Sequence, residues 1–275
     1  MNLIMSLVST DWVEKNNKNL KIIDCSWHMP NVYRNGYNEY LQSHIENSIF
    51  FDLDKNSNLN TDLPHMLVNN NEWEKIVSNM GINNKDEIVV YDNSDVLSSC
   101  RCWYNFIYFG HDSKLIHVLD GGLKKWNSEG KKVTAKIPEI KLTKYSAREL
   151  KNLVKNKSQI NDNITKQEFK VVDARSKERF EGKVKEPRQG LRSGSIPKST
   201  CVPFKELINE DHTFKDKKEI LKIFKNALGQ EITTNIVFSC GSGVTASVLA
   251  LAYSLINNKY MPTIYDGSWA EYGKK

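Results

Sequence analysis

The apolar positions of residues 236–256 predict a buried strand, a tight loop and a helix in direct succession. A run of apolar and small residues, Ile-Val-Phe-Ser, occupies 236–239 and is typical of a buried parallel strand. Residues 244–256 are rich in Ala, Leu and Val and are numerous enough for a helix. The residues between them are Cys240 and a Gly-Ser-Gly turn, so the cysteine is expected at the carboxyl end of the strand.

The same order of segments occurs twice along the chain. Four segments of the first half match four of the second half at a nearly constant offset: 20–26 with 169–175, 43–52 with 194–204, 87–92 with 235–240, and 118–122 with 264–268. Short apolar strands alternate with helical patterns in each copy, including 97–109 in the first and 244–256 in the second. The sequence therefore predicts an α/β fold with two tandem copies of one domain, each a small parallel sheet flanked by helices.

Composition marks the expected boundary between the copies. Residues 131–165 are rich in Lys, Asn and Ser and have weak apolar periodicity, which predicts a connecting segment with one short helix at 147–154. The Asn- and Lys-rich pieces 54–64 and 155–166 predict surface loops. We expect an N-terminal non-catalytic domain at 1–137, a linker at 138–164 and a C-terminal catalytic domain at 165–275.

Composition and charge disfavour several classes of protein. Apolar residues make up 39% and charged residues 26% of the chain, which is ordinary for a soluble globular protein. No stretch of about 18 apolar residues is present, so no membrane span is expected. A net charge of +6 without a nucleic-acid-binding motif favours a small anion over nucleic acid as the ligand. Because the first residues lack a targeting pattern, the expected location is cytoplasmic, with mitochondrial import as the alternative.

The five cysteines are an odd number without the spacing of a disulfide framework. Cys100 and Cys102 are two residues apart in a predicted helix and do not share a face, so packing is their expected role and a redox switch the alternative. No group of Cys and His residues has the spacing of a zinc site. We therefore predict neither a metal nor a cofactor.

Cys240 is the predicted nucleophile. Glycines on both sides of Ser242 let the backbone turn sharply with its N–H groups pointing inward, and the start of the following helix adds partial positive charge. Both effects favour the thiolate, although a buried structural cysteine is the alternative. The first copy has Asp92 at the equivalent position and no thiol in the loop after it. That copy is therefore predicted to be non-catalytic and to help form the wall of a cleft.

The segment Cys-Gly-Ser-Gly-Val-Thr-Ala at 240–246 resembles the active-site loop of the rhodanese family of sulfurtransferases, in particular the 3-mercaptopyruvate sulfurtransferases. The segments 120–123 and 265–269 also resemble the family. The resemblance implies two tandem rhodanese-like domains in which Cys240 carries a persulfide from a donor to a small thiol, a thioredoxin-like dithiol or cyanide. The loop residues that would hold the persulfide anion are Gly241, Ser242, Gly243, Val244 and Thr245.

The segment 173–188 resembles the substrate-binding stretch of mercaptopyruvate sulfurtransferases. The resemblance implies that Arg179 and Arg188 bind the carboxylate and the keto oxygen of the donor, a task that suits guanidinium groups. Arg175 follows the strand directly and is expected to form a structural ion pair. Thiosulfate-using relatives carry basic residues at the two positions after the cysteine, where this chain has neutral ones. The prediction is therefore 3-mercaptopyruvate as donor and pyruvate as product, with thiosulfate as the alternative donor.

His44 stands at the family's histidine position, and the resemblance implies a proton relay with an acidic residue and the loop serine. The residues after it depart from the family's Ile-Pro-Gly, and Asn35 stands near the place of the acidic partner, so a structural histidine is the competing interpretation. A carrier fed by the persulfide of a partner protein is an alternative function. Phosphatase chemistry is disfavoured because the loop lacks the arginine that cysteine phosphatases place at its end.

Overall fold

The structure, a computed structural model, describes residues 6–275 and divides into two compact units. Unit 1 comprises the chain up to residue 58 together with 67–150 and 209–213, and unit 2 comprises 59–66, 151–208 and 214–275. The division between 150 and 151 falls inside the predicted linker 138–164, whose two boundaries stay a prediction. Each unit also includes one short segment, 59–66 or 209–213, that is flanked in sequence by residues of the other unit.

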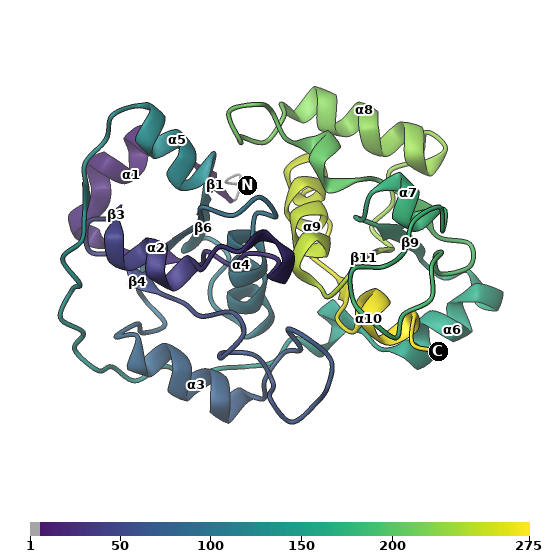
Figure 1. The fold of residues 1–275 in the computed structure, drawn as a ribbon, viewed down its shortest axis with the longest axis horizontal. Coiled ribbons are helices and arrows are strands. Elements are labelled where there is room, and N and C mark those ends of the chain that lie inside the picture. The colour runs from purple at the N-terminus through teal and green to yellow at the C-terminus, as the bar shows by residue number, and fades with distance from the viewer. Residues whose placement is uncertain (1–5) are drawn as a thin grey trace. The chain divides into compact units, whose positions relative to one another are not determined.

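Each unit contains one parallel sheet of five strands (Figure 1). In unit 1 the order is β1 (Leu7–Val8), β6 (Ile116–Leu119), β5 (Glu87–Tyr91), β2 (Leu20–Asp24), β4 (Ile49–Phe50). In unit 2 the order is β8 (Val154–Lys155), β12 (Ile264–Tyr265), β11 (Ile236–Ser239), β9 (Lys170–Asp173), β10 (Thr200–Cys201). The two orders coincide when the repeated segments are matched, which confirms the predicted duplication. A small antiparallel pair in unit 1 joins β3 (His44–Ile45) to β7 (Val133–Thr134).

Helices complete both units. Unit 1 contains α1 (Thr10–Asn16), α2 (Gly36–Gln42), α3 (Asn70–Asn79), α4 (Ser99–Tyr108) and α5 (Gly122–Ser128), with 3₁₀ turns at Asn17–Asn19 and Pro30–Val32. Unit 2 contains α6 (Lys157–Lys166), α7 (Lys177–Phe180), α8 (Lys217–Leu228), α9 (Val244–Ile256) and α10 (Ser268–Tyr272), with 3₁₀ turns at Lys151–Leu153 and Phe204–Leu207. Every residue of α4 is buried, as are nine residues of α9, which agrees with the aromatic-rich sequence of α4 and the Ala- and Leu-rich sequence of α9.

The prediction of a loop at 155–166 was wrong, because most of this segment is α6. Asn156 and Gln159 form a capping box at its start, and Ile160 is buried in the core of unit 2 beside Val171. The abundance of Lys and Asn concealed this cap and the apolar pair Ile160 and Ile164. The helix expected at 147–154 is replaced by the 3₁₀ turn Lys151–Leu153 and the strand β8.

Ser9 is the N-cap of α1, and its side chain accepts a hydrogen bond from the N–H of Trp12 at 3.2 Å. The expected absence of a targeting segment rests on residues 1–8, and 1–5 of these lie outside the described part of the chain. Between residues 6 and 275, no helix combines the length and the apolar character needed to cross a membrane.

Candidate functional site

Cys240 lies directly after β11, the central strand of the unit 2 sheet. Its side chain is buried, with 1% of the residue exposed, and its Sγ accepts a hydrogen bond from the N–H of Ser242 at 3.4 Å. The backbone then turns into α9 at Gly243, whose φ of 80° lies in the left-handed region that favours glycine. Strand, tight loop and helix therefore follow one another as the apolar pattern predicts.

A second loop braces the cysteine loop from the start of α10. The Ser268 hydroxyl accepts hydrogen bonds from the N–H groups of Cys240 and Gly243, both at 3.2 Å, and donates to the Tyr265 carbonyl at 2.8 Å. The Trp269 N–H adds a bond to the Cys240 carbonyl at 2.9 Å. The Gly243 amide, which is predicted to hold the anion, donates to Ser268 in the structure. Ser268 lies in the segment 265–269, which resembles the family, but it is not among the predicted site residues.

Arg179 and Arg188 converge on the cysteine loop. Arg179 projects from the short helix α7, and Arg188 from the irregular segment that follows it. A Cβ atom placed on Gly241 would lie 3.5 Å from Nη2 of Arg179 and 3.4 Å from Nη1 of Arg188. Nη2 of Arg188 also donates to the Ser242 hydroxyl at 3.3 Å. Two permanent positive charges thus lie next to the two residues that follow Cys240, an arrangement that suits an anionic ligand.

Buried ion pairs support these arginines. Arg175 forms the expected ion pair, with 2.7 Å between its Nη2 and the Asp173 carboxylate, and its Nη1 lies 2.8 Å from Glu186. Glu186 also binds Nη2 of Arg179 at 2.6 Å. Burial acts to lower the pKa of Arg175, but the hydrogen bonds and charges of Asp173 and Glu186 outweigh it and raise that pKa above its ordinary value. Glu186 was not among the predicted site residues.

The histidine at the loop serine is His65, which is not among the predicted site residues. Its Nδ1 lies 2.9 Å from the Ser242 hydroxyl, and it belongs to the segment 59–66 of unit 2. His44, in unit 1, has its Nδ1 2.6 Å from the Tyr40 carbonyl and its Nε2 3.2 Å from the Lys136 carbonyl. Among the described residues its bonds are to backbone, so its contacts match the competing interpretation of a structural histidine and not the relay.

Other thiols differ from Cys240 in their surroundings. Burial raises the pKa of Cys25 and Cys100 well above the ordinary value, and burial together with the Asp173 charge raises the pKa of Cys201 to about 12. These thiols are therefore poor nucleophiles near neutral pH. Across residues 6–275, no group of three His, Cys, Asp or Glu side chains is placed to hold a metal ion.

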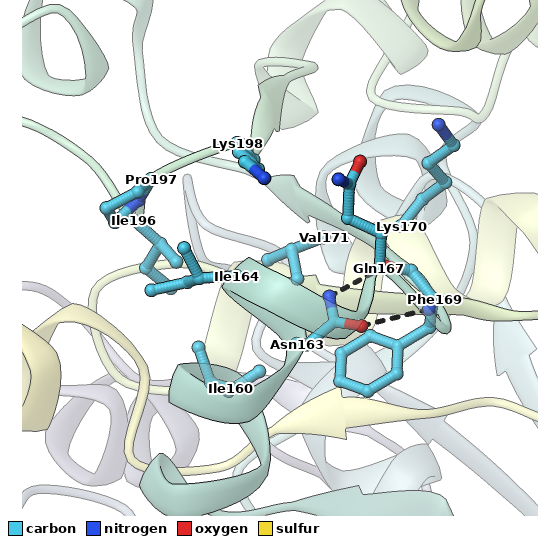
Figure 2. Close-up of a pocket in the computed structure, with 10 residues that line it drawn as sticks. All are labelled: Ile160, Asn163, Ile164, Gln167, Phe169, Lys170, Val171, Ile196, Pro197 and Lys198. Carbon is cyan, nitrogen blue, oxygen red and sulfur yellow. Dashed lines mark hydrogen bonds between the residues drawn. The ribbon is translucent and has the colours of Figure 1, made fainter.

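Unit 2 also contains a cavity of about 40 Å³, lined by residues of α6 and β9 and by residues 196–198 (Figure 2). Its lining includes Lys170, the first residue of β9, whereas Cys240 follows the last residue of β11. Because β9 and β11 are parallel, the cavity and the cysteine lie at opposite edges of the sheet. Asn163 bonds the Phe169 backbone twice at its wall, at 2.8 and 3.0 Å. The volume suits about one water molecule, so we assign it no substrate.

Comparisons with known proteins agree with this geometry. The rhodanese-like domain family matches residues 9–129 and 147–275. The chain is 38% identical to the Arabidopsis thaliana thiosulfate/3-mercaptopyruvate sulfurtransferase 1, mitochondrial, covering 97% of this chain and 75% of that one. It is 33% identical to the 3-mercaptopyruvate sulfurtransferase of Mus musculus, over 98% of this chain and 92% of that one. SseA from Escherichia coli, described as a 3-mercaptopyruvate sulfotransferase with the rhodanese fold, superposes with a TM-score of 0.84 at 29% identity, over 97% and 100% of the two chains.

Proposed function

Because the chain belongs to the rhodanese family, we propose that it is a sulfurtransferase that takes sulfur from 3-mercaptopyruvate, carries it as a persulfide on Cys240 and passes it to an acceptor thiol or cyanide. The observation that carries the proposal is the convergence of Arg179 and Arg188 on Gly241, next to a buried cysteine. A site built in this way places an anionic donor within reach of a nucleophilic sulfur.

Sulfur transfer begins with the donor carboxylate and keto oxygen bound by Arg179 and Arg188. The Cys240 thiolate attacks the donor's thiol sulfur, an S–S bond forms and the C–S bond breaks. The electron pair of the broken bond passes to the carbon, giving the enolate of pyruvate. This enolate takes up the proton lost by the donor's thiol, so pyruvate leaves and a persulfide anion stays on Cys240. The Ser242 hydroxyl, 2.9 Å from His65, provides a path for that proton beside the sulfur.

The persulfide anion is held by the surroundings of the loop. The Ser242 N–H already points at Sγ, and the 13-residue helix α9 begins at Val244, so its partial positive charge faces the anion. We assign the remaining anion contacts to the amides of Gly241, Val244 and Thr245, since the Gly243 amide is bonded to Ser268. The second half-reaction is attack on the outer sulfur by a thioredoxin-like dithiol, a small thiol or cyanide.

Loop charge supports 3-mercaptopyruvate over thiosulfate as the main donor. Gly241 and Ser242 are neutral, so the positive charge at the site comes from the arginines, whose forks match a carboxylate. Thiosulfate remains the second candidate donor because the Arabidopsis relative's name includes it. We propose the cytoplasm as the location; that relative's name assigns it to mitochondria, and imaging of the tagged full chain in cells distinguishes the two compartments.

The test is to mix the reduced protein with either donor and to follow product release and the mass of Cys240. Rapid pyruvate release with a gain of one sulfur on Cys240, absent in Cys240→Ser and retained in Cys201→Ser, is the expected result. Faster turnover with thiosulfate would reverse the choice of donor. If neither donor adds sulfur to Cys240, the proposal fails, and a carrier loaded by a partner's persulfide takes its place.

A further inference from the structure

Glu186 is a buried carboxylate in an otherwise exposed segment of unit 2. Residues 181–185 before it and Pro187 after it are exposed, whereas 1% of the Glu186 side chain is accessible. Removing a charged side chain from water is unfavourable unless partners compensate for the lost hydration. The segment therefore turns a carboxylate inward at one position, and its partners indicate why.

Those partners form a chain of alternating charges that leads from the sheet to the cysteine loop. Glu186 Oε1 accepts from Nη1 of Arg175 at 2.8 Å and from Nε of Arg179 at 3.3 Å, and its Oε2 accepts from Nη2 of Arg179 at 2.6 Å. Arg175 is itself anchored by Asp173 at the end of β9 and by the Gly194 carbonyl at 2.8 Å. Glu186 thus links a rigid strand end to the more exposed Arg179.

We propose that Glu186 is a positioning residue that orients Arg179 toward the donor and, through its charge, favours a donor with one negative charge over one with two. The proposal rests on the proposed function. Arg179 lies on a helix of four residues, and 21% of its side chain is exposed. An arginine without such a contact loses rotamer entropy when a ligand orders it, and this loss weakens binding. Contact with Glu186 through both Nε and Nη2 orders it before the donor arrives.

The charges of the cluster give the second part of the proposal. Three guanidinium groups (Arg175, Arg179, Arg188) and two carboxylates (Asp173, Glu186) lie in it, which leaves one net positive charge. The Glu186 carboxylate lowers the positive charge that the site offers to a bound anion, which costs a dianion more than a monoanion such as 3-mercaptopyruvate. Thiosulfate carries two negative charges, so removal of the Glu186 charge is expected to improve its binding relative to that of the monoanion.

Two substitutions of Glu186 separate the effect of its side-chain length from the effect of its charge. In Glu186→Gln one acceptor oxygen stays and the charge is lost, so kcat/KM for 3-mercaptopyruvate should fall about 10-fold, mainly through KM, and the donor preference should shift about 3-fold or more toward thiosulfate. In Glu186→Asp the charge stays but the side chain is too short to hold Arg179, so KM should rise with no change in donor preference. Glu181→Gln, in the same segment and paired with Lys183 on the surface, is the matched control and should resemble the wild type.

A double-mutant cycle tests whether Glu186 acts through Arg179. In an Arg179→Gln background, Glu186→Gln should lower kcat/KM for 3-mercaptopyruvate by less than about 2-fold, because the residue that Glu186 positions is absent. Equal losses with both donors, repeated in full in the Arg179→Gln background, would reduce Glu186 to a structural brace and overturn the proposal. Wild-type values of KM and donor preference in Glu186→Gln would overturn it as well.

A binding measurement keeps this result separate from the fate of the proposed function. Pyruvate is a monocarboxylate, and its binding to the reduced protein can be followed by calorimetry without turnover. Weaker binding to Glu186→Gln and Glu186→Asp than to wild type supports the positioning role even if no sulfur is transferred. Equal binding to all three, alongside normal turnover by wild type, rejects the positioning role and leaves the sulfurtransferase proposal intact.

Discussion

Asp24 and Asp173 end equivalent strands in the two units, yet their buried carboxylates have different partners. Asp173 forms an ion pair with Arg175, two residues further along the chain. The residue two positions after Asp24 is Ser26, whose backbone N–H donates to the Asp24 carboxylate at 2.9 Å. Burial, the largest effect, raises the pKa of Asp24 to about 6. Both units build the same sheet, so the fold does not need the arginine at this position. Its role in unit 2 is to hold Glu186 beneath the site.

The loops that follow the equivalent strands β5 and β11 show the same contrast. The Leu123 N–H donates to the Asp92 carbonyl and the Trp269 N–H to the Cys240 carbonyl, both at 2.9 Å, so the backbone link is common to both units. Gly122 of unit 1 stands at the position equivalent to Ser268 of unit 2. Both residues have a positive φ, which is 55° for Gly122 and 48° for Ser268. Unit 2 therefore accepts a strained serine, and its hydroxyl braces the two ends of the cysteine loop.

The largest expected effect comes from exchanging the nucleophile. Cys240→Ser should lower pyruvate release at least about 10³-fold, because the hydroxyl does not form a persulfide. Asp92→Cys in the Cys240→Ser background should restore no sulfur transfer, since the loop after residue 92 carries Asp95, whose charge repels an anionic donor. Mass spectrometry after incubation with 3-mercaptopyruvate measures both. A persulfide on the new cysteine, with turnover, would show that a cysteine at the end of this strand is sufficient for sulfur transfer. The two units would then differ functionally in little but the thiol.

The second prediction concerns the buried Asp24 carboxylate, whose hydrogen bond from the Ser26 N–H brings no opposite charge. Its folded pKa of about 6 exceeds the unfolded value of 3.8, so the folded protein retains a proton that the unfolded chain has released between those values. The contribution of Asp24 to stability is therefore lost as the pH rises from about 4 to 6, by up to about 3 kcal/mol. Asp24→Asn should remove this loss and raise the free energy of unfolding at pH 7. Denaturant unfolding from pH 4 to 7 measures it.

The equivalent substitution in unit 2 is the matched control, and it should lower the free energy of unfolding at pH 7 instead of raising it. Asp173→Asn removes the carboxylate that pairs with buried Arg175, so it should destabilise the protein at pH 7. A gain in stability in this variant, or a loss in Asp24→Asn, would mean that the two carboxylates are not distinguished by their partners.

The third prediction concerns Ser268. Ser268→Gly copies unit 1: it removes the hydroxyl but keeps the left-handed backbone that glycine adopts without strain. The loop amides of Cys240 and Gly243 lose their acceptor, so kcat should fall about 10-fold. Release of backbone strain should offset part of the lost hydrogen bonding, so Tm should change by no more than a few degrees. An unchanged kcat would show that the hydroxyl brace is dispensable, and a large fall in Tm would assign it to stability.

Local sequence signals predicted much of the fold and part of the site. The run from β11 through Cys240 to α9 was predictable because apolar residues, two glycines and an Ala- and Leu-rich helix adjoin one another. Glu186 and Ser268 act through contacts that depend on how the chain folds back on itself, and no local pattern marks them. His65 is the clearest case of a contact that the sequence does not reveal, since 177 positions separate it from Ser242. It also follows directly after the segment 54–64, whose composition predicts a surface loop.

The smallest expected effect concerns how unit 2 holds the segment 59–66. An ion pair between Lys274 Nζ and Asp62 Oδ2 at 2.5 Å fixes this segment near His65, but 42% and 80% of the two side chains are exposed. Water and salt screen such pairs, so Lys274→Gln should lower kcat/KM less than about 2-fold in dilute buffer and have no effect at 1 M salt. Steady-state kinetics over a salt series measure this, with Lys275→Gln as the control. A loss of 10-fold or more would mean that the surface pair is essential for placing His65.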